Sequence, residues 1–185
     1  MPASRILVIK HGALGDIIQG IDAYAKLRAG HPGAYIAVLT TPPFAGLFAA
    51  MPWFDDVITD HRAVVVNLLQ MMRMRRIMRQ SWDMVIDLQC SGRTARYHQF
   101  LTPQNLRWFG NVAGASDPYP DFAGVNNTSR MDIAAGLAGG SSLAGALACP
   151  NIFRLVTPNS VYLSLLQQSK AMDFIPFLVR TRAFI

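Results

Sequence analysis

A short, wholly apolar run near the start of the chain constrains the fold most. Residues 6–9 read Ile-Leu-Val-Ile, and Lys10 ends the run. Strands of a parallel sheet are buried on both faces, so they show continuous apolar runs instead of alternation. A turn over residues 11–16 and a helical pattern over residues 17–29 follow. We therefore expect the first strand and helix of an α/β layer structure.

The alternation of strands and helices continues along the chain. Further strands are predicted at residues 35–39, 56–59 and 84–88, and further helices at residues 42–50, 64–80 and 92–101. Repeated β-α units with right-handed crossovers build a Rossmann-like parallel sheet with helices on both faces. This doubly wound α/β arrangement is the fold class that the sequence predicts.

The pattern changes in the last part of the chain. Residues 114–121 have the composition of a loop, and residues 136–145 form a stretch of small residues without periodicity. A chain of 185 residues, 51% of them hydrophobic, suits one ordinary domain with a sizeable core. We expect a domain over residues 1–137 and a divergent or truncated, irregular tail over residues 138–185.

The charge of the chain indicates an anionic partner. Lys and Arg outnumber Asp and Glu by 17 to 11, and most of the cations are arginines, which bind phosphates and carboxylates through forked hydrogen bonds. An anionic membrane face fits this charge as well. No motif of a nucleic-acid reader is present, so we expect no nucleic acid as partner.

Several patterns are absent from the sequence. The two cysteines form no disulfide or metal pattern, the four histidines lack metal-ligand spacing, and no stretch suits a signal peptide or a membrane helix. We therefore expect no metal and a cytoplasmic location, with peripheral contact to the inner membrane as a further option.

The turn after the first strand is the first candidate site. In open parallel sheets ligands bind beyond the carboxyl ends of the strands, and Gly12 and Gly15 let the backbone turn tightly there. Asp16 begins the next helix, where its carboxylate is favoured by the helix dipole and could act as a general base. Asp at this position also commonly caps a helix, and the residues alone favour the cap.

A second group of polar residues ends the strand at residues 84–88. Asp87, Gln89, Ser91 and Arg93 are expected at the same sheet edge as Asp16, where they suit a sugar or its carboxylates. Arg93 could form a forked pair with a carboxylate. Asp87 and Gln89 could equally hold the neighbouring loops together by hydrogen bonds. Cys90 is interpreted as a small filler instead of a nucleophile.

The predicted helix over residues 64–80 combines methionines with arginines. Met71, Met74 and Met78 lie on one stripe, and four arginines spread over the other side. Such a helix could lie on an anionic bilayer. Packing of the methionines into the core, with solvated arginines, is the stronger interpretation.

Four stretches of the sequence, in order, resemble glycosyltransferase family nine, the ADP-heptose:lipopolysaccharide heptosyltransferases. The resemblance covers residues 5–130. The stretches are Arg-Ile-Leu-Val-Ile-Lys-His-Gly-Ala-Leu-Gly-Asp-Ile at 5–17, His-Pro-Gly-Ala at 31–34, Trp-Phe-Asp-Asp-Val at 53–57, and Trp-Asp-Met-Val-Ile-Asp-Leu-Gln at 82–89 followed by Ser-Gly-Arg-Thr at 91–94.

The resemblance implies the N-terminal, acceptor-side half of a GT-B fold and an inverting transfer of heptose from ADP-heptose, the donor substrate, with no further cofactor. The acceptor would be Kdo-bearing lipid A of the lipopolysaccharide inner core. Asp16 matches the proposed catalytic base of the family, which reverses the preference for a cap. Lys10, Gly12 and Gly15 match the loop that shapes the acceptor side.

The resemblance ends near residue 137. A complete member continues into a second β-α domain that binds the nucleotide sugar, and we find none of its expected groups. Without them the departing diphosphate is not stabilised, so we expect the chain alone to be inactive. The alternative is a non-catalytic α/β module that binds an anionic sugar or lipid. A nucleotide-binding Rossmann domain is a third, weaker interpretation.

Overall fold

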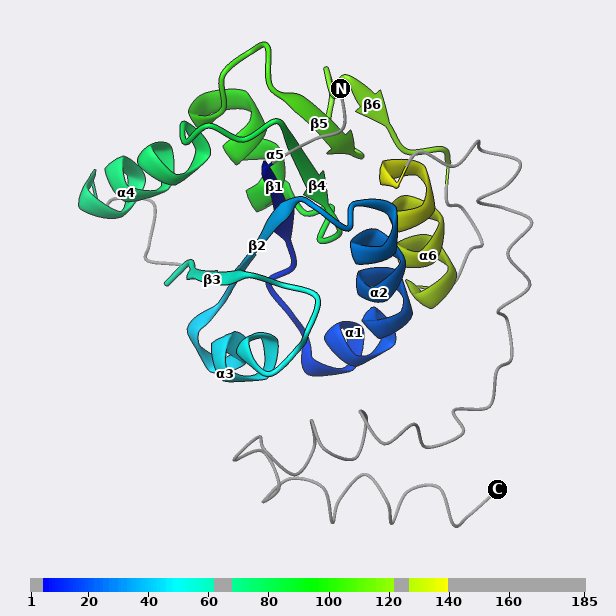
Figure 1. Ribbon diagram of the computed structural model, residues 1–185. Helices are drawn as coiled ribbons and strands as arrows, with labels where there is room; N and C mark the ends of the chain where they lie inside the picture. Colours follow the sequence, from blue (N-terminus) through cyan, green and yellow to red (C-terminus); the bar gives the residue numbers. More distant parts are fainter. Residues whose placement is uncertain (1–4, 62–67, 122–126, 140–185) are drawn as a thin grey trace, which may run out of the picture.

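The fold is built on a parallel β-sheet of six strands. We describe it from a computed structural model, which describes residues 5–61, 68–121 and 127–139. The strand order is β3-β2-β1-β4-β5-β6, and every neighbouring pair is parallel (Figure 1). The strands are β1 (Arg5–Ile9), β2 (Tyr35–Thr40), β3 (Asp56–Thr59), β4 (Met84–Asp87), β5 (Arg107–Gly110) and β6 (Asp117–Pro118). This confirms the predicted fold class.

Helices cover both faces of the sheet (Figure 1). They are α1 (Leu14–Gln19), α2 (Ile21–Gly30), the 3-10 turn η1 (Pro42–Phe44), α3 (Ala45–Ala49), α4 (Leu68–Met78), α5 (Gly92–Arg96), the π-type turn η2 (Tyr97–Leu101) and α6 (Asn127–Ala138). Successive strand residues point to opposite faces. Ile6 and Val8 of β1 therefore pack in the core with Tyr24 of α2, whereas Leu7 and Ile9 pack with Met78 of α4.

The helix predicted over residues 17–29 is wrong in its start and its continuity. The structure has α1 and α2 instead, which are separated at Gly20. The amide of Gly20 donates to the carbonyl of Ile17, three residues back, so the α-helical ladder is interrupted. A Cβ at Gly20 would lie 2.6 Å from Oη of Tyr24, so the tyrosine ring fills the space beside this glycine.

No strand or helix was predicted between residues 102 and 137, but the structure has β5, β6 and α6 there. Helix α6 was missed because small residues replace a clear apolar stripe. Ala134, Ala135 and Ala138 are buried in the core, and α6 packs against α2. A Cβ on Gly30 would lie only 2.9 Å from Cα of Gly139, so glycine allows the two backbones to approach. Residues 140–185 of the predicted tail lie outside the described residues.

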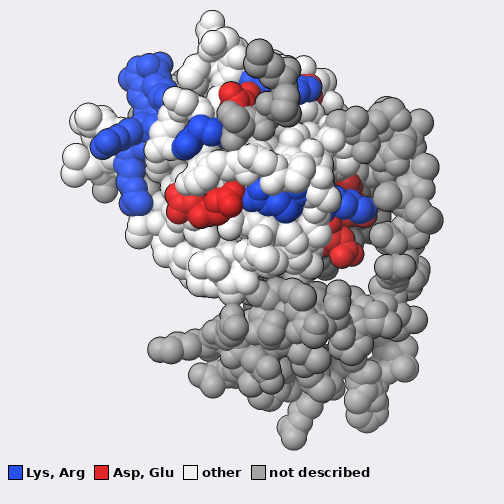
Figure 2. Space-filling view, viewed as in Figure 1, with Lys and Arg blue, Asp and Glu red and all other residues white. Residues whose placement is uncertain are grey.

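Helix α4 confirms the expectation for two of its three named methionines. Met74 and Met78 are buried, as predicted for core packing, whereas Met71 is 45% exposed. The prediction for Met71 is therefore wrong, because the buried face of α4 is centred on Met74, Ile77 and Met78, and Met71 lies beyond its margin. Figure 2 shows basic side chains gathered over α4 among uncharged neighbours. Residues 64–67 of the predicted helix lie outside the described residues.

No helix in the described ranges is both long and apolar enough to cross a membrane.

We expect that replacing Tyr24 by phenylalanine keeps or raises the stability of the chain. Oη of Tyr24 is buried and has no hydrogen-bond partner within the described residues, while its ring packs against Phe48, Trp53 and Phe54. Removing a desolvated hydroxyl should raise the free energy of unfolding by up to about 1 kcal/mol, measured by urea denaturation. Tyr24→Ala, which also removes the ring, should lower it by about 3 to 5 kcal/mol. A marked loss of stability in Tyr24→Phe would show that the hydroxyl of Tyr24 does form a stabilising hydrogen bond.

Candidate functional site

The candidate site lies where the strand order reverses direction. From β1 the chain proceeds outward to β2 and β3, and then returns to place β4 on the other side of β1. Ile9 and Asp87, the last residues of β1 and β4, are neighbours in the register, and the amide of Leu88 donates to the carbonyl of Ile9 at 3.1 Å. The loops that leave these two strands diverge at this point. Ligands of open α/β sheets bind at such switch points.

The loop after β1 is fixed by its neighbours. Oε1 of Gln89 accepts hydrogen bonds from the amides of His11 (2.9 Å) and Gly12 (3.3 Å), and Oγ1 of Thr41 donates to the carbonyl of His11 at 2.8 Å. Gly12 has φ +143°, and a Cβ there would lie 2.7 Å from the ring of Phe44. Only glycine fits this position. Gln89 thus makes the loop-bracing contacts that the sequence left open, and its ligand role stays a prediction.

Asp16 sits in the first turn of α1, half-buried, next to this loop. Its Oδ2 accepts a hydrogen bond from the amide of Ala13 at 3.3 Å. The carboxylate therefore makes a capping contact at the start of the helix, which is the alternative to a catalytic role. A carboxylate has about four acceptor positions, so capping leaves capacity for a substrate hydroxyl. Gly15 lies within α1, and no atom within 4 Å would contact a Cβ there. The approach to Asp16 along this glycine is open.

Asp87, the last residue of β4, is fully buried. Its Oδ1 accepts from the amides of Gln89 (3.0 Å) and Cys90 (2.8 Å), while Oδ2 is buried without a hydrogen-bond partner among the described residues. Burial raises the pKa of Asp87 to about 6, although the hydroxyl of Thr94, these amides and the charge of Lys10 act in the opposite direction. The carboxyl therefore changes its charge near neutral pH.

Two cations accompany Asp87 at the switch point. Lys10 is only 2% exposed, and its Nζ lies 3.5 Å from the carbonyl oxygen of Leu88. Burial lowers the pKa of Lys10, and the charges of Asp16 and Asp87 partly offset this effect. Arg130 of α6 lines a small pocket of about 10 Å³ together with Asp87, Leu88, Cys90, Tyr119, Met131 and Ala134. The charges of Asp16, Asp87 and Arg130 all act on the pKa of Lys10, so the switch point combines two carboxylates with two cations.

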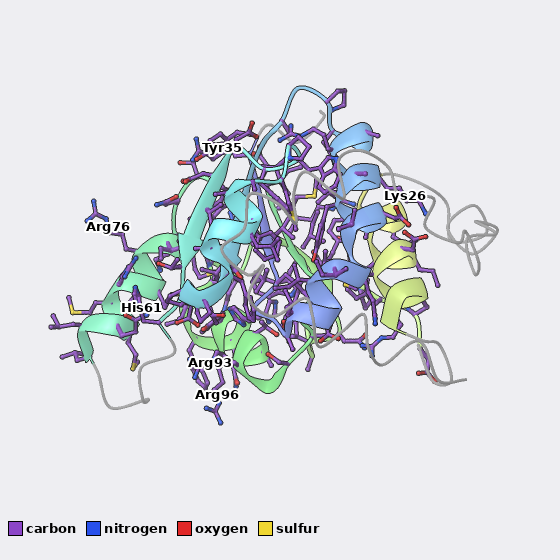
Figure 3. The ribbon with its side chains drawn as sticks, turned by 90° about the horizontal axis from the view of Figure 1, so that it is seen from below. Lys26, Tyr35, His61, Arg76, Arg93 and Arg96 are labelled. Atoms are coloured by element: carbon purple, nitrogen blue, oxygen red, sulfur yellow. The ribbon has the colours of Figure 1, made fainter. Side chains whose placement is uncertain are left out.

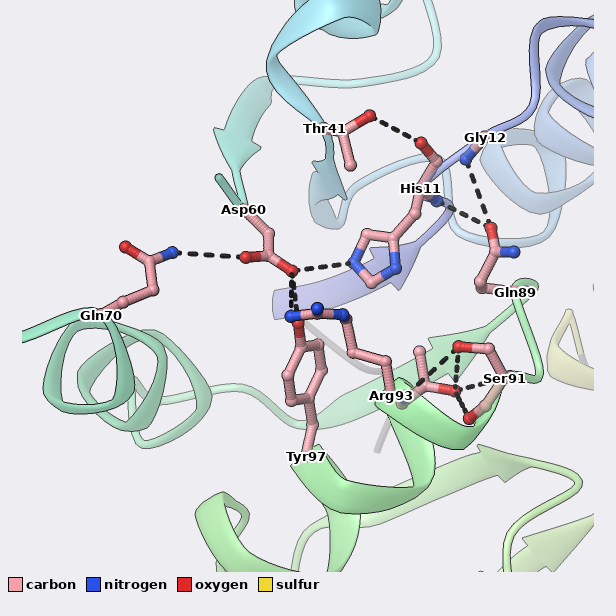
Figure 4. Close-up of polar contacts among 10 residues, drawn as sticks. His11, Gly12, Thr41, Asp60, Gln70, Gln89, Ser91, Arg93 and Tyr97 are labelled. Carbon is pink, nitrogen blue, oxygen red and sulfur yellow. Dashed lines mark hydrogen bonds and ion pairs between the residues drawn. The ribbon is translucent and has the colours of Figure 1, made fainter. Parts of the chain in front are cut away.

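A second polar group surrounds Asp60, which directly follows β3 and is fully buried. Oη of Tyr97 donates to its Oδ2, and Nε2 of Gln70 donates to its Oδ1 at 3.3 Å. Oδ2 also lies 3.7 Å from Nε2 of His11 and 3.8 Å from a guanidinium nitrogen of Arg93. Figure 4 shows these five residues, the Asp60 cluster, converging from four segments of the chain.

Two of the residues predicted for the site have structural partners of their own. Ser91 is the N-cap of α5, where its Oγ accepts from the amide of Thr94 at 3.4 Å. Arg93 faces the internal carboxylate of Asp60, yet its side chain remains 35% exposed. Figure 3 shows Arg93 and Arg96 close together on α5. An external anion that contacts Arg93 would therefore compete with Asp60 for the guanidinium group.

The sequence placed Asp16, Asp87 and Gln89 at one sheet edge but did not identify the Asp60 cluster or Arg130. Asp60 could have been found, because it directly follows a predicted strand, as Asp87 ends one. Tyr97 lies four residues after Arg93 on the same helical path, which is a second usable signal. No local signal indicates that Arg130 faces Asp87, since α6 itself was not predicted.

Cys90 is half-buried and its backbone is in the left-handed region, with φ 46°. Burial raises the pKa of its thiol to about 11. The nucleophilic thiolate is therefore scarce at neutral pH, in agreement with the interpretation as a filler. Within the described part of the chain, no group of three His, Cys, Asp or Glu side chains could hold a metal ion.

Comparison with known proteins gives matches at the level of structure. The E. coli heptosyltransferase WaaC, solved with ADP-2-deoxy-2-fluoro heptose, superposes with a TM-score of 0.60 and 16% identity over 75% of this chain and 49% of its own. For E. coli ADP-heptose lps heptosyltransferase II the TM-score is 0.55 and the identity 21%, over 71% of this chain and 40% of the other. For a family 9 glycosyl transferase from Veillonella parvula the TM-score is 0.63 and the identity 18%, over 77% of this chain and 43% of the other. No protein-family model and no curated protein matches the sequence.

These comparisons establish the fold of the described residues. The chain spans about half the length of the solved structures that it matches, and its identity to them is low. The sheet with its switch point is therefore the shared feature, and the resemblance that the sequence indicated is confirmed at the level of the fold: this chain has the α/β fold found in heptosyltransferases and other glycosyltransferases of family nine.

Proposed function

We propose that this chain is the acceptor-binding half of an inverting glycosyltransferase of heptosyltransferase type, whose acceptor is a Kdo-bearing lipid A. One observation carries the proposal. Asp16 and the loop after β1 stand at the switch point of a sheet that superposes on heptosyltransferases. The domain boundary near residue 137 and the substrate-binding roles of Lys10, Gly12 and Gly15 belong to the same proposal.

In the proposed reaction, the carboxylate of Asp16 takes the proton from an acceptor hydroxyl. The hydroxyl oxygen forms a bond to the anomeric carbon of the heptose, and the bond from that carbon to the ADP oxygen breaks, so that ADP leaves with the electron pair. A positioned general base contributes roughly 10²- to 10⁴-fold to such a step. The position of Asp16 beside the open side of Gly15 supports this role.

The proposed reaction also needs residues that bind the nucleotide sugar, and these must come from outside the acceptor-binding half. Transfer requires donors that stabilise the departing diphosphate, and we expect a nucleotide-binding domain to supply them. We therefore expect the chain alone to bind the acceptor without transferring heptose. A lipid-borne acceptor would place this activity at the cytoplasmic face of the inner membrane.

We expect calorimetric titration to detect binding of a soluble Kdo-containing acceptor and no binding of ADP. Asp16→Ala should change the acceptor affinity by less than about tenfold, because the proposed base acts mainly in the transition state. Asp22→Ala is the matched control, since Asp22 is exposed in the first turn of the neighbouring α2. Binding of ADP would instead favour a nucleotide-binding Rossmann domain, and binding of neither ligand would refute the acceptor assignment.

The transfer of labelled heptose separates the enzyme from a non-catalytic binding module. The chain would be mixed with the nucleotide-binding half of a heptosyltransferase, and Asp16→Asn should reduce any transfer by at least about 10²-fold. Acceptor binding without transfer in the mixture, under conditions where a full-length heptosyltransferase is active, would favour the binding module.

A further inference from the structure

The outward face of α4 is the largest group of exposed apolar side chains in the described structure. Leu68, Leu69, Met71 and Met72 are 67%, 78%, 45% and 60% exposed, and all four belong to the first half of the helix. The buried face of α4 consists of Met74, Ile77 and Met78. Packing into the core therefore does not explain the four residues, which we call the α4 tip. Contiguous exposed apolar groups of this kind mark interaction surfaces.

Arginines continue the same surface toward the end of the helix. Arg73, Arg75, Arg76 and Arg79 are exposed, and Figure 3 shows Arg76 extending away from the molecule. None of the ion pairs between described residues involves these four arginines. From residue 61 to residue 82 the sequence contains no Asp or Glu. The basic half of α4 is therefore not neutralised by acids of its own segment.

The order of these groups along the helix matches the depth profile of a lipid surface. With a rise of about 1.5 Å per residue, the arginines lie roughly 10 Å behind the apolar tip. Apolar residues of surface-bound helices reach about 5 to 10 Å into the boundary between headgroups and acyl chains. Guanidinium groups one to two turns behind such residues would meet the lipid phosphates, with which they form forked hydrogen bonds.

We propose that α4 is a docking surface for an anionic membrane, in which the α4 tip enters the lipid boundary and the four arginines contact phosphates. This deepens the proposed function, because a lipid-borne acceptor would then be approached from the surface that holds it. The argument itself uses only the exposure and charge of α4. It can therefore be tested apart from the acceptor and from heptose transfer.

The test is sedimentation of the full chain with vesicles that contain no lipopolysaccharide. Vesicles of phosphatidylcholine with roughly 30% phosphatidylglycerol should bind the chain at least about tenfold more tightly than pure phosphatidylcholine vesicles. About 0.5 M salt should remove most of this difference, because salt screens exposed charges. Equal binding to both vesicle types, or no binding to either, would overturn the proposal.

Variants assign the binding to α4. Leu69→Glu/Met72→Glu and Arg75→Gln/Arg76→Gln should each weaken binding to the anionic vesicles by at least about tenfold. Arg107→Gln, which removes an exposed cation at the start of β5, should leave it within about twofold. A circular dichroism spectrum equal to that of the wild type would verify that each variant folds.

Unchanged vesicle binding in both α4 variants would refute the assignment. So would a wild-type dimer that Leu69→Glu/Met72→Glu converts to a monomer, because a second copy of the chain would then cover the tip. Failure of acceptor binding with intact vesicle binding would refute only the proposed function.

Discussion

Replacing Asp87 by asparagine should stabilise the chain by about 2 to 3 kcal/mol near pH 8 and should leave its stability nearly unchanged below about pH 4. The reason is the burial of this carboxyl, which raises its pKa from 3.8 to about 6 in the folded chain. Asparagine keeps the oxygen that accepts from the amides of Gln89 and Cys90 and removes the charge that the folded chain disfavours.

The sign follows from proton binding. A carboxyl whose pKa is higher in the folded state binds its proton more tightly there, so its protonated form stabilises the fold at low pH. This stabilisation is complete below the unfolded pKa of 3.8 and is lost as the pH rises through about 6. Asparagine has no such dependence, so the difference between variant and wild type grows between about pH 4 and pH 7.

Urea denaturation of both proteins at several pH values measures this difference, in which the titration of groups that do not interact with Asp87 cancels. Asp22→Asn, at an exposed position of α2, provides the control and should show a small difference at every pH. A difference for Asp87→Asn that does not vary with pH would show that folding does not raise the pKa of this carboxyl. If Asp87 also serves the proposed acceptor site, the variant should be more stable and bind acceptor more weakly, as often occurs at functional sites.

Replacing Asp60 by alanine should lower the free energy of unfolding by about 3 kcal/mol. The substitution leaves the buried hydroxyl of Tyr97 without its acceptor and removes the carboxylate beside His11. Because His11 belongs to the loop after β1, we also expect a weaker affinity for the acceptor. Tyr97→Phe, which removes one hydrogen bond and leaves Gln70 on the carboxylate, should cost about 1 kcal/mol.

Urea denaturation of Asp60→Ala, Tyr97→Phe and the double variant measures their coupling. Since the two side chains share one hydrogen bond, the double variant should lose less stability than the sum of the single variants. Asp22→Ala again controls for the loss of a carboxylate, here an exposed one. Full additivity, or a loss in Asp60→Ala no greater than in Asp22→Ala, would contradict the contact between Asp60 and Tyr97.

Four of the six strands were predictable because they are short, bounded runs rich in apolar residues, whereas β5 and β6 were not predicted. Those predicted at residues 35–39, 56–59 and 84–88 are found as β2, β3 and β4, with ends that differ by at most one residue. The helices were less well defined, because their ends depend on tertiary contacts. The break at Gly20 is filled by the ring of Tyr24, and α6 packs through small residues that carry no periodic signal.

The candidate site shows the same limit. The sheet-edge rule placed the residues after β1 and β4 together, because it needs only the strands. The Asp60 cluster requires the strand order, since Asp60 and Tyr97 are separated by 37 positions in the sequence. The buried, unpaired Oδ2 of Asp87 also follows only from three-dimensional packing.

The close contact between Gly30 and Gly139 has a consequence for engineering. Gly30 ends α2 and shortly precedes the start of β2, so this contact lies at the amino ends of the strands, away from the crevice. If the proposed nucleotide-binding domain were fused directly behind residue 139, it would therefore begin at the amino ends of the strands, whereas the proposed site lies at their carboxyl ends. Its connecting peptide would have to run back along roughly the 18 Å of α6, which requires at least about six extended residues. Shorter tethers would hold the two halves in an unproductive orientation, whereas supplying the partner as a separate polypeptide avoids the constraint.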